Sequence, residues 1–255
     1  ASARETAARV AAGAVAMALL GRLGVRVGSW VQRIGDVAID WQEAVDQAAV
    51  EASPVRCPDP LASERMVAAI DAARERGDTL GGSAVVSATG VVAGLGSYAQ
   101  WDRKLDGLIA QALCSIPSVK GVEIGAAALA AQSPGSAVHD SPRYVAGEGF
   151  RHLTNRQGGL TGGVTDGEPV WATVHFKPIS TLLSPLRSVD ARSGEEVNAH
   201  YERSDICVVP AGAVVAEAML GWVIAAAMAE KLGGDSIAEM GRNLAAYRRS
   251  TRRLR

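Results

Sequence analysis

The sequence predicts an α+β fold in which apolar helices pack against β-strands. Two alanine-rich segments of similar composition, 3–21 and 211–231, are long enough and apolar enough to form core helices. Between them lie β-branched stretches of strand length, at 25–39, 83–96 and 170–179. The 255 residues are 48% hydrophobic and 21% charged, which is enough to build a sizeable core in one large domain or two small ones.

Residues 3–21 contain no proline and are rich in alanine, so they predict a helix. Its charged residues lie in the first half only, so we expect polar first turns and a buried remainder. The alternating stretch at 25–39 predicts a strand or two, broken at Gly28 and Gly35. Three prolines then make 54–60 a connection, because proline disfavours regular structure.

Helical spacing returns over 61–76 and ends at Gly77, as helices commonly do. The segment 83–96 predicts a strand with an interruption at Gly90. An amphipathic helix is predicted at 101–113, because its leucines and isoleucine recur on one side.

A short strand is predicted at 119–124 and another at 170–179. Between them, 133–167 is glycine-rich and weakly periodic, which is typical of a functional or disordered stretch. The apolar run inside 211–231 approaches membrane-spanning length, but Glu217 near its middle would be costly in a bilayer. We therefore predict a buried core helix and no membrane partner.

The last segment, 236–255, predicts a helix whose end, 240–255, is a basic helix or tail. Lys and Arg total 26 against 27 Asp and Glu, so the chain has no overall positive field to attract nucleic acid. Any anion site must therefore be local.

The three cysteines and four histidines do not form a metal-binding pattern. Cys57, Cys114 and Cys207 are widely spaced, with no paired motif and no histidine at ligand spacing. We expect buried, reduced thiols and no metal site.

Glycines recur beside short polar motifs that could bring the backbone close to a ligand. These motifs lie at 77–82, 154–159, 161–163 and 233–236. Glycines of this kind can point successive N–H groups at a phosphate, although none of the motifs matches a nucleotide-binding pattern. Tight turns are the alternative interpretation of each motif.

Charged groups suited to an anion lie in two segments of the second half. In K-P-I-S-T at 177–181, Lys177 comes near a strand end and two hydroxyl residues follow it. Arg203 and Asp205 are two apart, so they share one side of an extended chain. A guanidinium can bind a phosphate or carboxylate in bidentate fashion, and a carboxylate can hold a proton. An ordinary surface pair is the alternative for Arg203 and Asp205.

Eight motifs in order make the chain resemble chorismate synthases. They are A-S-A-R-E-T-A at 1–7, G-D-T-L-G-G at 77–82, S-I-P-S-V-K-G-V-E-I-G at 115–125, G-S-A-V-H-D at 135–140, T-N-R-Q-G-G-L-T-G-G-V at 154–164, K-P-I-S-T at 177–181, E-R-S-D-I-C-V-V-P-A at 202–211 and E-K-L-G-G-D-S at 230–236. They cover essentially the whole chain at nearly the spacing of that family.

The resemblance implies a fold and an assembly. The fold is a sandwich in which a central layer of antiparallel helices lies between β-sheets, with pseudo-symmetric halves. Residues 1–255 would form one partial domain, truncated because the family's N-terminal third is absent. A full-length protein would be a cytoplasmic homotetramer.

The resemblance also implies a reaction. The family carries out a 1,4-trans elimination of phosphate from 5-enolpyruvylshikimate 3-phosphate, giving chorismate in the shikimate pathway of aromatic amino acid biosynthesis. This lyase reaction on a small-molecule substrate needs reduced FMN, with NADPH as an indirect reductant.

Matching positions carry the family's site residues onto this chain. The implied flavin contacts are Ala1, Ser2, Pro117, Ser118, Gly162, Lys177, Pro178, Ile179, Ser180, Thr181 and Arg203. Arg4 and Arg203 match arginines that hold the anionic groups of the substrate. Asp205 matches the acid implicated in proton removal through the flavin.

Two departures limit what the resemblance implies. The family's acid–base histidines belong to the absent N-terminal third, so we expect this chain alone to form no chorismate. Pro117 stands where the family often has Asn or Gln, and it offers neither a hydrogen-bonding side chain nor an N–H. A diverged, non-catalytic paralogue that serves as a binding or assembly subunit is therefore the alternative. A phosphate-ester-binding domain unrelated to shikimate is a third reading.

Overall fold

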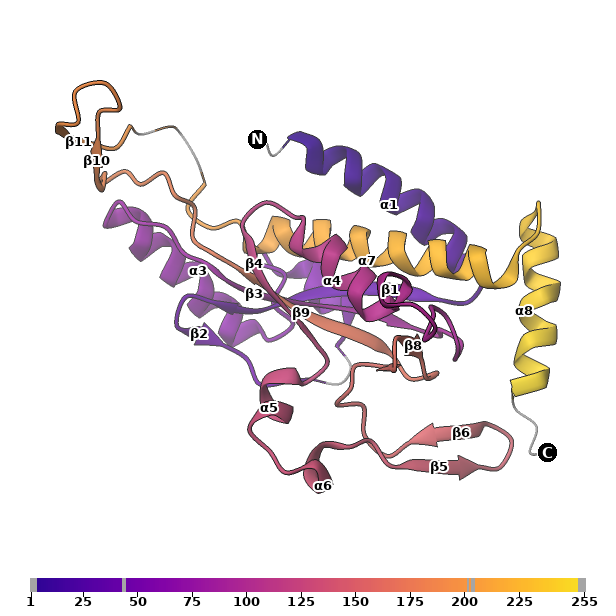
Figure 1. Ribbon diagram of the computed structural model, residues 1–255. Helices are drawn as coiled ribbons and strands as arrows, with labels where there is room; N and C mark the ends of the chain where they lie inside the picture. The colour runs from indigo at the N-terminus through magenta and orange to yellow at the C-terminus, as the bar shows by residue number, and fades with distance from the viewer. Residues whose placement is uncertain (1–3, 43–44, 201, 203–204, 252–255) are drawn as a thin grey trace.

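The computed structural model describes residues 4–42, 45–200, 202 and 205–251. Its centre is a five-stranded antiparallel sheet in the order β2-β1-β3-β9-β4 (Figure 1). The strands of this sheet are β1 (Arg26–Ile34), β2 (Val37–Ala38), β3 (Gly82–Thr89), β4 (Val119–Ile124) and β9 (Val170–Phe176). The structure is therefore mixed α and β, as the sequence predicts.

Three helices cover one face of this sheet. They are α1 (Arg4–Arg22), α4 (Leu105–Cys114) and α7 (Val209–Leu232). The central helix, α7, packs on β1 and β3 and is flanked by α1 and α4. In the part of the chain that the structure describes, α7 is the one helix long and apolar enough to cross a bilayer, yet most of its apolar window is buried by these neighbours. The prediction of a core helix is confirmed.

The helix layer is not uniformly antiparallel, which corrects one expectation. Gly13 faces Ala218 and Met17 faces Gly221, so α1 and α7 run in the same direction. The topology explains this. Strands β1 and β9 both run antiparallel to β3, so they run parallel to each other. Helix α1 precedes β1 through a tight turn and runs opposite to it, and α7 follows β9 and runs opposite to that strand. The two helices therefore share one direction. Only α4 opposes α7, since Arg103 just before α4 pairs with Glu230 near the end of α7.

Helix α1 is much more exposed than the sequence predicts. Only Gly13, Ala16 and Leu20 of this helix are buried, and Val15 is 73% exposed. The helix lies at the outside of the layer, so it buries one stripe against α7 and leaves several of its other apolar residues, such as Val15, exposed to solvent. The expectation of a buried remainder is therefore wrong.

Gly13 makes a testable contribution to this helix pair. A Cβ at Gly13 would lie 2.5 Å from the Cβ of Ala218 and 2.7 Å from its backbone. We therefore expect Gly13→Ala to lower the free energy of unfolding by about 1–3 kcal/mol through overpacking. Gly21→Ala is the control, because a Cβ there meets nothing within 4 Å, and it should leave stability unchanged or raise it by up to about 1 kcal/mol. Equal effects of the two variants in urea unfolding would contradict the close packing.

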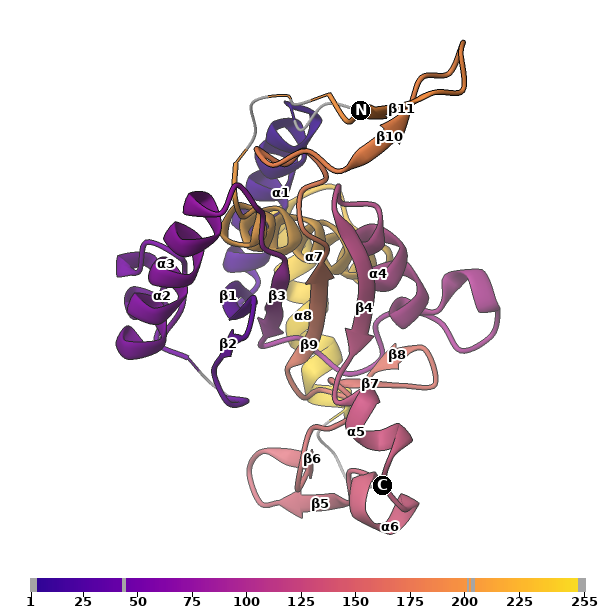
Figure 2. The same cartoon turned by 90° about the vertical axis from the view of Figure 1, so that its left-hand side faces the viewer.

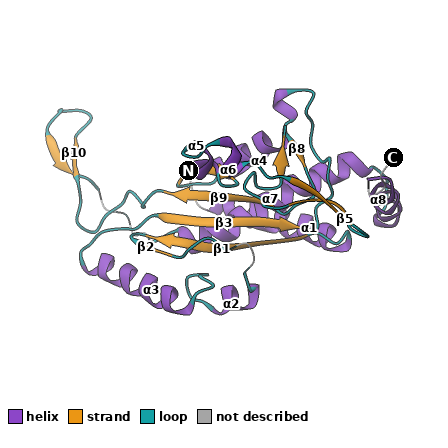
Figure 3. Ribbon diagram, turned by 90° about the horizontal axis from the view of Figure 1, so that it is seen from below, coloured by secondary structure: helices purple, strands orange, loops and turns teal. Residues whose placement is uncertain are grey.

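The remaining helices lie at the edges and ends of the sheet. They are α2 (Gln47–Ala52), α3 (Pro60–Glu75), the 3₁₀ turn η1 (Trp101–Arg103), α5 (Ala127–Ala131), α6 (Gly135–Val138) and α8 (Ile237–Thr251). Figure 3 shows α3 along the β2 edge and α8 at the far end of the helix layer. The predicted helices at 61–76 and 101–113 are thus confirmed, with the second divided by a turn, and the helix predicted over 236–255 is confirmed as far as Thr251. Residues 252–255 of the basic tail lie outside the described residues.

Three small hairpins replace most of the irregular stretches. They pair β5 (Pro142–Val145) with β6 (Gly149–His152), β7 (Leu160–Thr161) with β8 (Val164–Thr165) and β10 (Arg187–Val189) with β11 (Glu196–Asn198). Figure 2 shows the first and the last of these hairpins projecting from opposite ends of the molecule. The long stretch at 133–167 is therefore more regular than its composition predicts.

Two predicted strand interruptions have different outcomes. Strand β1 continues through Gly28, where a Cβ would lie 2.9 Å from the amide of Gln47, so glycine serves packing at this position. Gly90, with φ of +78°, ends β3, and residues 91–96 do not continue the strand. A glycine in a β-branched run can therefore either pack closely against a neighbouring segment, as Gly28 does, or end the strand, as Gly90 does.

A charged network joins α7 to the sheet. Ser29 Oγ donates a hydrogen bond of 2.7 Å to Glu217 Oε2, and an Arg56 nitrogen lies 3.5 Å from the same oxygen. Arg56 also donates to Glu51 at 2.6 Å, and it adopts a left-handed backbone with φ of +58°. Burial raises the pKa of the Glu217 carboxyl, although the hydrogen bond from Ser29 and the charge of Arg56 oppose that effect.

The cysteines are only partly as expected. All three thiols are free, and Cys57 is buried. Cys114, however, is exposed at the last position of α4, so the expectation of buried thiols is wrong for that residue.

Candidate functional site

Segments far apart in the sequence meet beyond the end of β9, where Lys177 follows the strand. The backbone N–H of Lys177 donates to Ser118 O at 2.9 Å. On the other side, Thr79 Oγ1 donates to Ile179 O at 2.7 Å, and Leu80 N donates to Ile206 O at 2.9 Å. We call residues 79–81, 117–118, 177–181 and 205–207 the strand-end site. It contains most of the described flavin-matched residues, and Asp205 directly precedes Ile206 in it.

The first turn of α7 opens beside the strand-end site. The ring of Phe176 lies against Gly212, where any Cβ would overlap it. No side chain caps the N-terminus of α7 at Val208, and its first turn contains no acidic residue. Pro210 in this turn has no N–H, and the Cys207 sulfur accepts a hydrogen bond from the N–H of Val209, so this helix start offers few free backbone donors to an anion.

Lys177 adds a positive charge to this end of the sheet. Its Nζ lies 3.3 Å from Pro178 O, and among the described residues no carboxylate forms an ion pair with it. A partly exposed ammonium of this kind can hold a phosphate or carboxylate group.

The glycines of 77–82 have a structural role in the strand-end site. A Cβ at Gly81 would overlap Phe176 O, and one at Gly82 would overlap Arg33 O. Gly77 has φ of +70° and packs against Ser184. These glycines therefore let neighbouring strands and loops approach each other, rather than lining a phosphate cradle.

The start of α1 reaches the same end of the molecule. The guanidinium of Arg9 donates to Ser115 Oγ at 2.6 Å and to Ser115 O at 3.3 Å, which ties α1 to the chain just before Pro117. Arg4 begins α1 one and a half turns earlier. Ala1, Ser2 and Arg203 lie outside the described residues, so the expected meeting of Arg203 with Lys177 stays a prediction.

Gly162 is the described flavin-matched residue that does not join the others. It lies in the turn between β7 and β8, next to the start of β9, whereas Lys177 follows the end of β9 (Figure 1). Seven residues of strand separate the two ends, roughly 20 Å. Within one chain, Gly162 and the strand-end site are therefore apart.

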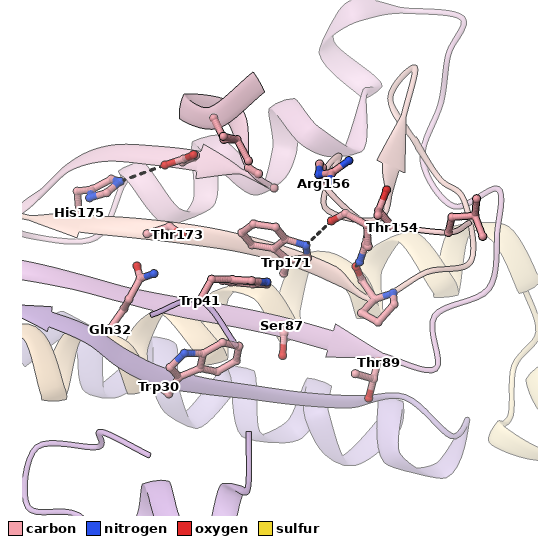
Figure 4. A pocket seen from close by; sticks show the side chains of 17 residues that line it. Trp30, Gln32, Trp41, Ser87, Thr89, Thr154, Arg156, Trp171, Thr173 and His175 are labelled. Carbon is pink, nitrogen blue, oxygen red and sulfur yellow. Dashed lines mark hydrogen bonds and ion pairs between the residues drawn. The ribbon is translucent and has the colours of Figure 1, made fainter. Parts of the chain in front are cut away.

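The outer face of the sheet, opposite the helix layer, holds a hollow of about 480 Å³. Trp30, Trp41 and Trp171 line it together with Arg156 and His175 (Figure 4). We call it the tryptophan pocket. No sequence motif indicates this pocket, and the one local signal for it is the alternation of β9, which places Trp171, Thr173 and His175 on one face.

The loop beside the tryptophan pocket is held by Asp140. Its carboxylate accepts hydrogen bonds from Thr154 Oγ1 at 2.5 Å and from the backbone N–H groups of Arg156 at 2.9 Å and Gln157 at 2.8 Å. Burial alone would raise the pKa of the Asp140 carboxyl, but these hydrogen bonds outweigh it and lower that pKa. Two of the sequence motifs thus fold into one rigid unit.

In the part of the chain that the structure describes, no three His, Cys, Asp or Glu side chains converge on a point that could hold a metal ion.

Comparison with known proteins places these features in a family. A family model described as chorismate synthase matches residues 1–229. A chorismate synthase of Moorella thermoacetica is 55% identical over 252 residues, covering 97% of this chain, and one of Symbiobacterium thermophilum is 51% identical over 251 residues. A crystal structure of a chorismate synthase superposes with a TM-score of 0.85 at 38% identity, covering 99% of this chain and 71% of that one. The chain spans 65% and 64% of the length of the two curated relatives.

Proposed function

This chain belongs to the chorismate synthase family, and we propose that it contributes the strand-end site to the elimination of phosphate from 5-enolpyruvylshikimate 3-phosphate. The observation that carries the proposal is that segments 177–181 and 205–207 both hydrogen-bond to residues 79–80, with the Lys177 ammonium beside them. A positive ammonium suits a substrate and a cofactor that both bear phosphate.

The residues of the strand-end site fit reduced FMN as the cofactor, with NADPH as an indirect reductant. Lys177 and the N–H groups of 179–181 would hold its phosphate, because the Lys177 ammonium has no carboxylate partner among the described residues. When bound, the reduced flavin would supply electron density as the phosphate of the substrate departs. Pro117 can give only apolar contact.

The charged side chains of this chain would hold the substrate and move a proton. Arg4 and Arg203 would bind the anionic groups of the substrate through guanidinium forks. Asp205, exposed at the strand-end site, would accept or hold a proton during elimination. We also propose that the family's remaining third supplies the acid–base histidines, so this chain alone forms no chorismate.

We further propose that the exposed side of the helix layer is the inner face of a sandwich. The exposed apolar residues of α1 and α7, including Val15 and Trp222, suit a second β-sheet laid on them. The distance of Gly162 from the strand-end site fits a homotetramer in which that glycine serves another copy. A cytoplasmic location remains a prediction.

Lys177 offers a direct test of the phosphate grip. We expect Lys177→Gln to weaken FMN binding by about 10-fold, because it removes one charge-assisted hydrogen bond. Quenching of flavin fluorescence in the 255-residue chain and in the complete enzyme measures the affinity. Lys120→Gln is the matched control, since Lys120 is exposed on β4 outside the strand-end site, and it should bind FMN like the parent. An unchanged affinity of Lys177→Gln would remove this residue from the cofactor site.

The alternative, a non-catalytic paralogue, is favoured by one observation. Pro117 has no N–H to donate, and Ser118 beside it adopts an unusual left-handed backbone with φ of +71°. If neither the parent nor Pro117→Asn binds FMN in the complete protein, the chain is a non-catalytic paralogue and the proposed enzymatic function is wrong. If Pro117→Asn alone binds, this chain has lost the cofactor through that position.

A further inference from the structure

The tryptophan pocket has a rigid aromatic floor. Trp30 and Trp171 are only 3% and 7% exposed, and they pack with Val50 and Val85 on the outer face of the sheet. Trp171 Nε1 donates a hydrogen bond of 2.9 Å to Asn155 O, which fixes the orientation of its indole. The floor is therefore formed before any ligand arrives.

The floor already accepts one flat ring. The indole of Trp41 lies 3.9 Å from that of Trp171 between ring centroids, at an angle of 30°. Trp41 comes from the loop after β2 and is 44% exposed, so it lies over the floor and remains open to solvent. Stacking of this kind favours planar aromatic partners.

One end of the pocket carries an uncompensated positive charge. The backbone N–H of Arg156 is held by Asp140, but its guanidinium has no hydrogen-bond acceptor or ion-pair partner among the residues that the structure describes. At the other end, His175 lies 3.8 Å from Glu123, so a carboxylate already faces that imidazole. Figure 4 shows Arg156 and His175 on either side of the tryptophans. An incoming anion would therefore bind at the Arg156 end.

The tryptophan pocket is separate from the strand-end site. None of the described residues matched to the flavin or the substrate lines it. Its volume of about 480 Å³ lies within the range of small-molecule sites, roughly 300–1,000 Å³.

We propose that the tryptophan pocket binds a planar aromatic carboxylate, with the ring on the exposed indole of Trp41, which itself stacks on Trp171, and the carboxylate on the guanidinium of Arg156. This inference goes beyond the proposed elimination reaction and does not depend on it. A planar ring matches the floor, and a carboxylate matches the one guanidinium that lacks a partner there.

The test uses 1-naphthoate as the probe on the complete 255-residue chain. We expect saturable binding by equilibrium dialysis, at least 10-fold weaker binding of the neutral 1-naphthalenemethanol and at least 10-fold weaker binding of the saturated decahydro-1-naphthoate. Arg156→Gln should weaken 1-naphthoate about 10-fold or more, since a bidentate contact to a carboxylate is lost. Arg143→Gln is the matched control, because Arg143 lies on the β5–β6 hairpin and does not line the pocket.

Three results would overturn the proposal. They are no saturable binding of 1-naphthoate at millimolar concentration, equal binding to Arg156→Gln and the parent, and competitive displacement of 1-naphthoate by FMN. The last would assign the pocket to the flavin. The circular dichroism and the urea midpoint of Arg156→Gln should match those of the parent, because its side chain has no described partner to lose. The Lys177 experiment is independent, so failure of one proposal leaves the other standing.

Discussion

Asp205→Asn, made in a complete enzyme that contains this chain, is expected to lower the saturating turnover rate by about 10²- to 10⁴-fold, the usual loss for an acid–base group. Asparagine keeps the size of the side chain but cannot take up a proton. Asp205 lies at the strand-end site, immediately before the contact between Leu80 and Ile206. Affinities for FMN and substrate should stay nearly unchanged, because the substitution preserves reach and shape.

Separate measurement of the turnover rate and the substrate affinity distinguishes two roles of Asp205. If Asp205 only orients Arg203, its loss should weaken substrate binding and leave the saturating rate close to that of the parent. Asp190→Asn is the matched control, because Asp190 is an exposed carboxylate at the β10–β11 hairpin, away from the strand-end site. An unchanged saturating rate in Asp205→Asn would leave this chain with ligand-binding residues only.

Arg56→Met is expected to lower the free energy of unfolding at pH 8 by about 3 kcal/mol, because it leaves the Glu217 carboxylate without its cation. The expected loss is at the lower end of the usual range of roughly 3–5 kcal/mol. The reason is that neither side chain is fully buried, since 20% of the Glu217 surface and 13% of the Arg56 surface remain exposed. Urea unfolding at pH 8 measures the change.

The same variant should lose less stability at pH 5. Burial already raises the pKa of the Glu217 carboxyl, and Glu51 nearby adds to that effect. A carboxyl with a raised pKa in the folded state stabilises the protein below its ordinary value of 4.5, and this contribution is lost as pH rises above that value. Removing Arg56 raises the folded pKa further. The difference between Arg56→Met and the parent should therefore grow from pH 5 to pH 8.

Two further variants control the Arg56 experiment. Arg74→Met removes an arginine from the exposed pair with Asp71 and should change stability by no more than about 0.5 kcal/mol. The double variant Arg56→Met with Glu217→Met should recover most of the loss, because no buried charge is then left alone. A double variant as unstable as Arg56→Met would show that the packing of Arg56, and not its charge, is what matters.

Local spacing was sufficient to predict most of the elements. The helices near 61–76 and 211–231 and the strand at 119–124 were expected and are confirmed by α3, α7 and β4. Helical spacing and β-branched runs depend on residues close together in the chain, so they can be recognised without knowing which segments pack against them. The motifs also indicated the family, which the comparisons confirm.

Contacts between distant residues could not be predicted in this way. Gly28 continues a strand because Gln47 packs against it, and α1 is exposed because it lies at the outside of the layer. The parallel course of α1 and α7 follows from the strand order, which no local pattern contains.

Sequence motifs were enough to indicate the family, the α+β class and the segments that contain Lys177 and Asp205. Folding was needed to show that the segments after Lys177 and Asp205 both bond to residues 79–80, while Gly162 lies at the other end of β9. Folding also brings Trp41, Trp171 and Arg156, whose guanidinium has no partner among the described residues, into one pocket. The physical reason is that propensity and motif chemistry are local, whereas a site depends on strand order and on close packing between segments far apart in the chain.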